Sequence, residues 1–158
     1  MRRKIKNIFA EKACNSFGSA KTNGIGLQLE FCEHGDFVET AWSPARQYEG
    51  YPSAVHGGIL ASLMEETAAW TMYIKAGCSG VSARMNFRYR KPVHSSQKEI
   101  FVRGKIVKQY RNLCSIFVEV LNEAGEVCTE AEMVYFLFSH EKSVRDYHYP
   151  ADYNRFFE

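Results

Sequence analysis

The stretch VHGGILASLMEETAAW, residues 55–70, decides how this chain folds. After a histidine and two glycines it becomes an apolar run without proline, and Gly77 follows the run as a stop signal. We therefore expect one long helix over residues 57–75. Apolar side chains are spread around most of its surface, which is typical of a buried helix. Two adjacent glutamates, Glu65 and Glu66, lie inside it, where a carboxylate is costly unless its desolvation is compensated.

The rest of the chain predicts antiparallel strands, because segments of alternating apolar and polar residues are joined by connections of hairpin length. In VSARMNFRYRKP, residues 81–92, the alternation places Val81 and Met85 on one face and Ser82 and Arg84 on the other. The other predicted strands are a hairpin over 25–42 that turns at His34-Gly35, and the segments 100–110, 113–121 and 127–138.

These elements predict an α+β fold in which one long central helix is wrapped by a five- to six-stranded antiparallel sheet. At 158 residues the chain fits a single domain, 1–158, with a core over about 25–138 and a short N-terminal segment before it. The segment 43–54 reads as a loop. The C-terminal tail YHYPADYNRFFE is too aromatic for a free disordered end, so we expect it to pack against some other surface.

The composition argues against several classes of function. Twenty Lys and Arg against eighteen Asp and Glu leave a net charge of +2, which does not favour a nucleic-acid partner. No apolar stretch approaches the ~20 residues of a membrane span and no signal peptide is evident, so we expect a cytoplasmic protein without a membrane partner. The five cysteines are scattered and lack metal-ligand spacing, so we expect reduced thiols and neither a metal nor another cofactor.

Helical periodicity gives the two glutamates different surroundings. Glu65 shares a stripe with Gly58, Ala61 and Ser62, whose small side chains admit a close neighbour or a thin ligand. Glu66 lies about 100° further round, among larger apolar side chains. We expect Glu65 to line a cleft with Ser62 beside it; the alternative is that one or both glutamates face solvent.

The His56-Gly57-Gly58 sequence marks the start of the helix. Free backbone N–H groups at a helix N-terminus favour an anion or oxyanion, and glycine lets a ligand approach the backbone closely. The alternative is that His56 only caps or packs the helix and that the glycines mark a tight turn. His56 and Glu65 are roughly 13 Å apart along the helix axis, so a site that uses both needs a second subunit.

Three segments resemble one protein family: GYPSAVHGGILASLMEE at 50–66, VSARMNFRYRKPV at 81–93 and EAGEVCTEAEMVYFLF at 123–138. They look like the hotdog-fold acyl-CoA thioesterases of the phenylacetate-pathway type, over roughly residues 25–138. The His-Gly-Gly with an acidic residue nine positions on is the most specific part. The resemblance implies a hotdog fold, an acyl-CoA substrate, and a homodimer or homotetramer that pairs through continuous sheets, with the site at the subunit interface.

Carried over position by position, the resemblance makes Glu65 the catalytic carboxylate. It makes the N–H of Gly58, beside Gly57, the group that polarises the thioester carbonyl. His56 would fix that turn or the substrate, and Ser82 would help to hold the attacking water.

Two positions depart from the family pattern. The family residue at Glu65 is more often aspartate, and Gly50 stands where some members have an asparagine. Arg84 and the basic residues near it either contact the phosphates of coenzyme A or form the solvated face of a strand.

Two other functions remain as alternatives. One is a hotdog enoyl-CoA hydratase or dehydratase, and the other is a non-catalytic acyl-CoA-binding module. The acyl group also stays open, because Trp70, Met72 and Tyr73 suit an aromatic or medium-chain pocket and equally well a core.

Overall fold

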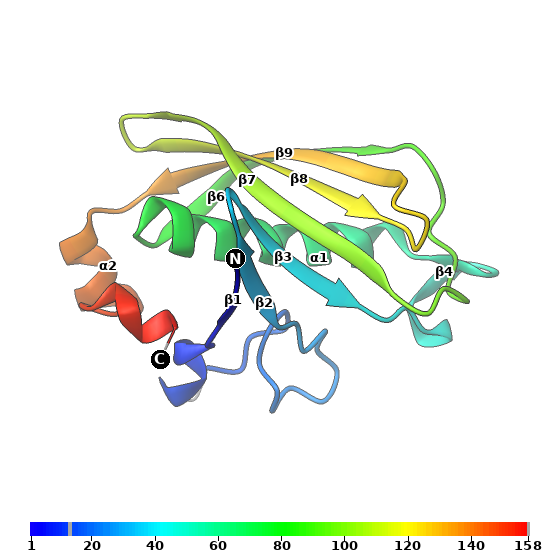
Figure 1. The fold of residues 1–158 in the computed structure, drawn as a ribbon, viewed down its shortest axis with the longest axis horizontal. Helices are drawn as coiled ribbons and strands as arrows, with labels where there is room; N and C mark the ends of the chain where they lie inside the picture. Colours follow the sequence, from blue (N-terminus) through cyan, green and yellow to red (C-terminus); the bar gives the residue numbers. More distant parts are fainter. Residues whose placement is uncertain (13, 158) are drawn as a thin grey trace.

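Seven strands form one antiparallel sheet that curves around a single long helix in the computed structural model, which describes residues 1–12 and 14–157 (Figure 1). The strands follow the order β1-β2-β3-β7-β8-β9-β6 across the sheet, and every neighbouring pair is antiparallel. Their bounds are β1 Arg2–Ile5, β2 Phe31–His34, β3 Phe37–Trp42, β6 Gly80–Tyr89, β7 Ile100–Tyr110, β8 Leu113–Leu121 and β9 Val127–Leu137.

The central helix, α1, spans Gly57–Thr71 and continues as a wider turn over Met72–Ala76. Gly77 ends it with a φ of +71°, a left-handed conformation that glycine adopts without a Cβ penalty. The predicted helix and its stop are therefore confirmed. The shorter elements are α2 His140–Tyr147, the 3-10 turns Ile8–Lys12, Arg46–Tyr48 and Tyr153–Phe156, and a small hairpin of β4 Glu49–Tyr51 and β5 Ala54–Val55 within the predicted loop.

The sheet has seven strands rather than the predicted five or six, because the N-terminal segment adds an edge strand. β1 pairs with β2 from Arg2 opposite His34 to Ile5 opposite Phe31. Three of its four residues are basic and exposed, so no apolar alternation marked it in the sequence. β2 is also shorter than predicted, since Gln28 adopts a φ of +53° that interrupts the extended backbone before it.

α1 packs closely on the sheet because a glycine in β7 leaves room for it. A Cβ at Gly104 would meet the Thr71 Oγ1 atom at 2.6 Å. The buried hydroxyls of Thr67 and Thr71 each donate to a carbonyl one turn back, at 2.7 Å, so these polar atoms are satisfied inside the core. The other buried residues of α1 are Leu60, Leu63, Met64, Ala68 and Trp70.

β6, the other edge strand, departs from the alternation predicted for it. Its register on β9 shifts between Ser82 and Arg84, where a bulge inserts an extra residue. Ser82 therefore lies opposite the buried Tyr135 and on the same face of the sheet as Met85, whereas Val81 lies on the outer face and is 48% exposed. The prediction that paired Val81 with Met85 was wrong, because a strict period of two cannot anticipate a bulge.

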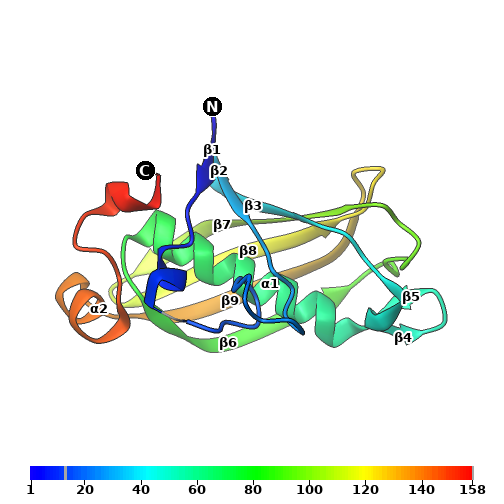
Figure 2. The same cartoon turned by 90° about the horizontal axis from the view of Figure 1, so that it is seen from below.

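The two ends of the chain cover the side of α1 that the sheet leaves open (Figure 2). The ring of Phe9 lies 5.8 Å from that of Trp70, and the fully buried Phe156 contacts both. The Lys6 N–H donates to the carbonyl oxygen of Phe156 at 2.8 Å and joins the two ends. The burial of Phe156 and Tyr149 confirms that the aromatic tail packs on the domain.

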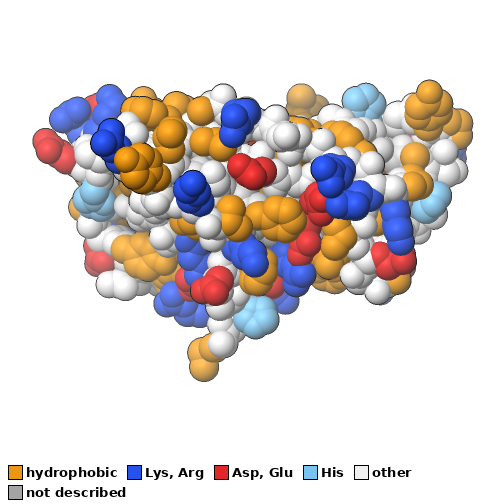
Figure 3. All heavy atoms as spheres, turned by 90° about the horizontal axis from the view of Figure 1, so that it is seen from above, with side chains coloured by type: hydrophobic (Ala, Val, Ile, Leu, Met, Phe, Trp, Pro, Cys, Tyr) orange, Lys and Arg blue, Asp and Glu red, His pale blue; other side chains and the backbone are white. Residues whose placement is uncertain are grey.

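The outer face of the sheet carries basic, acidic and apolar side chains intermixed (Figure 3). One apolar row crosses β6, β9 and β8, where Val81, Phe136 and Leu113 are paired neighbours and each is more than 40% exposed. No helix in the described part of the chain is long and apolar enough to cross a membrane.

Candidate active site

A pocket of about 320 Å³ lies beside Glu65, between α1, the edge strand β6 and the N-terminal segment. The helix contributes both glutamates and two of the three small residues that the sequence placed next to Glu65. The lining residues are Ser16, Phe17, Gly18, Ala61, Ser62, Glu65, Glu66, Met85 and Phe87. The structure therefore brings Glu65 and Ser62 together at one cavity.

The Glu65 carboxylate is half-buried and has one side-chain donor among the described residues. The hydroxyl of Tyr135, from β9, lies 3.2 Å from the Glu65 carbonyl oxygen and 3.4 Å from its Oε1, and donates to them. Burial and the nearby charge of Glu66 raise the pKa of Glu65 above its ordinary value, and the Tyr135 hydrogen bond offsets only part of this rise. A carboxylate with a raised pKa is a stronger base, which suits proton transfer near neutral pH.

Glu66 has a defined place that the sequence did not predict. Its Oε1 accepts a hydrogen bond from the Trp70 indole N–H at 3.1 Å, one turn further along α1. Its side chain also packs against Gly18, where any Cβ would overlap it. Glu66 is thus held between Trp70 and the N-terminal segment, with its charge next to Glu65.

His56 caps the helix in this chain. Its Nδ1 accepts a hydrogen bond from the Gly58 N–H at 2.8 Å, so this N–H already has a partner. Within residues 1–12 and 14–157, the N–H of Gly57 donates to no group. The Tyr89 hydroxyl, from β6, donates to the Gly57 carbonyl oxygen at 2.9 Å, and its ring packs against the glycine.

The remaining predicted site residues lie at different distances from the pocket. Ser62 lines it and donates its hydroxyl to the Gly58 carbonyl oxygen at 2.9 Å. Ser82 stands opposite Tyr135 across the strand pair, on the face that Glu65 approaches. Arg84 follows the bulge opposite Val134 and is exposed on the outer face, so this chain does not bring it to the Glu65 pocket.

Within one chain, the N-terminus of α1 lies outside the Glu65 pocket. His56 and Gly57 are absent from the residues that line the Glu65 pocket. Sequence reasoning also missed Tyr135 and the segment 16–18. Tyr135 lies on the buried face of β9, but its contact with Glu65 spans 70 positions of sequence and left no local signal.

Comparisons with known proteins show similarity to one family over part of the chain. Residues 53–129 match the family model of the thioesterase superfamily. No protein of curated function matches the sequence.

Solved structures share the architecture at low sequence identity. The thioesterase superfamily protein RHA08564 is 19% identical, with a TM-score of 0.71 over 77% of this chain; the match covers 60% of that protein's own length. Zebrafish thioesterase superfamily member 2 is 22% identical, with a TM-score of 0.64 over 73% of this chain and 89% of that one. A hypothetical thioesterase of Streptococcus pneumoniae TIGR4, crystallised with coenzyme A, is 22% identical, with a TM-score of 0.60 over 66% and 80% of the two chains. The chain has the hotdog fold of these structures, and residues 53–129 of its 158 are similar to the thioesterase superfamily.

Proposed function

We propose that this protein is an acyl-CoA thioesterase, which hydrolyses a thioester to a free acid and coenzyme A. The observation that carries the proposal is the half-buried Glu65 carboxylate, whose raised pKa suits a base and which lines a pocket at the edge strand β6. The family match and the related Streptococcus pneumoniae structure with coenzyme A support the substrate class.

The proposed chemistry begins with a water molecule between Glu65 and the thioester carbonyl carbon. The water oxygen forms a bond to that carbon while its proton passes to Glu65, and the C–S bond then breaks with the electron pair leaving on sulfur. The thiolate needs little acid assistance, because thiol pKa values are near ~8.5. In the alternative route Glu65 attacks the carbon itself, and water hydrolyses the resulting anhydride.

We propose that a second copy of the chain completes the site. A single helix separates His56 from Glu65 by roughly 13 Å, which is too far for one reacting atom. β6 is a ten-residue strand at the edge of the sheet, and pairing two copies there would extend the sheet and place each helix start near the other Glu65. In a homodimer or homotetramer of this kind, the Gly57-Gly58 turn of the partner polarises the carbonyl.

The structure favours Gly57 within this turn as the donor. Its N–H has no acceptor among the described residues, whereas the Gly58 N–H is held by His56. In this assignment His56 fixes the turn, and Ser82 helps to hold the water from its position opposite Tyr135.

The test of the proposed function is the release of free thiol from short, medium-chain and aromatic acyl-CoAs. Wild type should hydrolyse at least one class, and Glu65→Gln, which keeps the size of the side chain, should lose about two or more orders of magnitude in rate. Glu141→Gln, at an exposed position of α2, is the matched control and should behave as wild type. Hydrolysis that is equal in the Glu65 variant, or conversion of enoyl-CoA to hydroxyacyl-CoA without thiol release, would overturn the proposal.

The shared site has its own test. Chains with Glu65→Gln and chains with Gly57→Val are each expected to be inactive. A mixed dimer should regain activity at one of its two sites, because that site combines the intact Glu65 of one chain with the intact Gly57 of the other. A Cβ at Gly57 lies at ordinary contact distance, 3.5 Å, from the Tyr89 ring, and circular dichroism checks that the valine variant is folded before chains are mixed. If mixed dimers form, as mass spectrometry would show, and remain inactive, the two halves do not belong to one site.

A further inference from the structure

A second cavity, of about 440 Å³, follows the Glu65 pocket along the same face of α1. The helix residues that line the two cavities come at helical spacing. Ser62 and Glu65 line the first cavity, and Ala69 and Tyr73 line the second. From Glu65 to Tyr73 the distance along the axis is about two turns. The second cavity is therefore placed where the far end of a long acyl chain would lie.

The walls opposite the helix keep the same order. Met85 and Phe87 of β6 line the first cavity, and Gly80, at the start of that strand, lines the second. The N-terminal segment passes both cavities, with Phe17 at the first and Phe9 at the second. Phe9 and Gly80 are only half-buried, so the second cavity has accessible apolar walls.

Glu66 stands at the boundary between the two cavities. Glu66 and Ser16 are the residues that line both of them, so a chain that passes from one cavity to the other must pass Glu66. The side chain is held in this place by the Trp70 indole N–H, which donates to its Oε1 at 3.1 Å, and by its packing against Gly18. The indole is uncharged, so this hydrogen bond does not neutralise the carboxylate.

The charge of Glu66 separates short acyl chains from long ones. A hydrocarbon chain that enters the second cavity would displace water from the carboxylate, and desolvating a charge without a counter-ion is costly. A short acyl chain ends in the first cavity and avoids this cost. The same side chain also narrows the passage by its bulk, because Gly18 holds it against the N-terminal segment.

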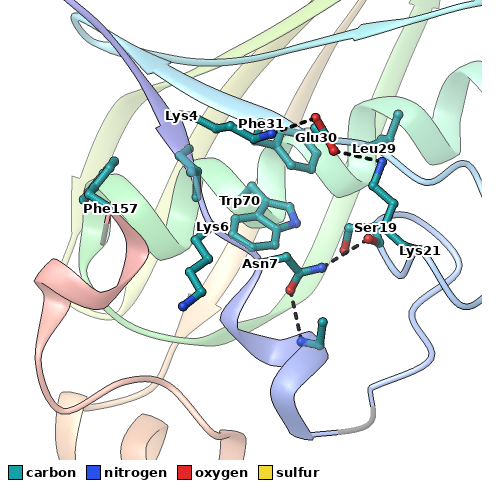
Figure 4. Close-up of a pocket in the computed structure, with 12 residues that line it drawn as sticks. Lys4, Lys6, Asn7, Ser19, Lys21, Leu29, Glu30, Phe31, Trp70 and Phe157 are labelled. Carbon is teal, nitrogen blue, oxygen red and sulfur yellow. Dashed lines mark hydrogen bonds and ion pairs between the residues drawn. The ribbon is translucent and has the colours of Figure 1, made fainter.

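A third cavity, of about 480 Å³, shares Trp70 with the second and does not extend this path (Figure 4). Its apolar walls are almost fully buried. Its one carboxylate, Glu30, already lies 3.2 Å from the ammonium groups of both Lys4 and Lys21 (Figure 4). This cavity therefore offers neither an open apolar surface nor a free charge to the end of a chain.

We propose that Glu66 determines acyl chain length, and that it restricts this protein to short-chain acyl-CoAs such as acetyl- and butyryl-CoA. The inference rests on the proposed thioesterase function and names the substrate class of that site. Glu66 acts on the far end of the acyl chain, whereas Glu65 acts at the thioester. Shortening the Glu66 side chain joins the two cavities and admits a medium chain.

The test compares kcat/KM for butyryl-CoA and octanoyl-CoA, measured as release of free thiol. Wild type should favour butyryl-CoA by about tenfold or more, and Glu66→Ala should raise the octanoyl-to-butyryl ratio by about tenfold, because it opens the second cavity. Glu66→Gln keeps the size of the side chain and an acceptor for the Trp70 N–H, so it should raise the ratio by only about threefold, through loss of the charge. The ratio cancels any change in the pKa of Glu65, because both substrates need the same base.

A further substitution locates the chain. Ala69→Leu fills part of the second cavity, so adding it to Glu66→Ala should return the ratio toward the wild-type value. Glu141→Ala removes a glutamate at an exposed position of α2 and is the matched control, which should keep the wild-type ratio.

The outcomes separate this inference from the proposed function. Hydrolysis with a wild-type ratio near one, or with the same ratio in wild type and both Glu66 variants, would overturn the role of Glu66 and leave the thioesterase function standing. If circular dichroism shows that Glu66→Ala does not fold, the ratio in Glu66→Gln decides. Failure to hydrolyse any acyl-CoA would overturn the proposed function, and this inference with it.

Discussion

Three features of its surroundings set the pKa of Glu65, and two of them can be removed by single substitutions. Burial and the charge of Glu66 raise its pKa, and the hydroxyl of Tyr135 lowers it. A carboxylate that acts as a base must be ionised, so kcat/KM is expected to rise with pH through the pKa of Glu65. The acid limb of the pH profile therefore reports directly on these neighbours.

Removing the charge of Glu66 should move this limb to lower pH. In Glu66→Gln the amide oxygen still accepts from the Trp70 N–H, but no negative charge opposes ionisation of Glu65, so its pKa falls. The measurement is kcat/KM for the best acyl-CoA from pH 4.5 to 8. Glu141→Gln serves as the control and should leave the limb where it is. An unchanged or upward-shifted limb would contradict the assignment of Glu65 as the titrating base.

Removing the hydroxyl of Tyr135 should move the same limb the other way. Tyr135→Phe deletes the donor to Glu65 Oε1, so the ionised carboxylate is less stabilised and its pKa rises further. The double variant with Glu66→Gln should lie between the two single variants. If both substitutions move the profile in the same direction, a general loss of structure explains them better than electrostatics.

At the scale of the elements, the start of α1 depends on one side chain. His56→Ala removes the acceptor of the Gly58 N–H and should lower the free energy of unfolding by about 1 kcal/mol, as measured by urea denaturation. His56→Asn keeps a good cap and should retain stability. If activity is lost in both variants but stability only in the first, His56 also contacts the substrate. Full stability of the alanine variant would show that the cap contributes nothing.

The packing of α1 on β7 depends on the missing side chain at Gly104. Gly104→Ala would place a Cβ 2.6 Å from the Thr71 Oγ1 atom in a fully buried contact, and should destabilise the fold by about 2 kcal/mol. Adding Thr71→Ala should recover part of the loss, because it removes the clashing oxygen. Gly24→Ala, at a position with open space around it, is the control and should be nearly neutral. Equal thermal unfolding midpoints for the two glycine variants would contradict this packing argument.

At the scale of the whole molecule, the two edge strands of the sheet differ in length and charge, and this difference predicts self-association through β6. β1 is four residues long and mostly basic, which discourages pairing, whereas β6 is a ten-residue strand with a free edge. We expect sedimentation to give at least twice the 18.1 kDa of one chain. We also expect the free-edge amides of β6 to resist hydrogen exchange while those of β1 exchange quickly. A monomeric mass together with rapid hydrogen exchange in β6 would rule out an active site shared by two subunits.

The sequence alone determined the features that arise from local patterns. The apolar run after His56-Gly57-Gly58 predicted α1, and the alternating segments predicted the strands over 100–138. The small-residue stripe predicted which glutamate lies beside Ser62, because a helical period of 3.6 residues is a local property. The resemblance of the same segments to the hotdog thioesterases then identified this wrapped architecture as the hotdog fold.

Only the tertiary structure decided the parts that depend on contacts between distant segments. β1 forms because β2 offers it a partner, and the bulge in β6 turns Ser82 toward Tyr135 although the local alternation places it on the other face. Glu65 acquires its environment from Tyr135, 70 positions away, and Glu66 from the segment around Gly18. Such contacts carry no periodic signal, because their free energy comes from the burial and pairing of groups that meet only after the chain has folded.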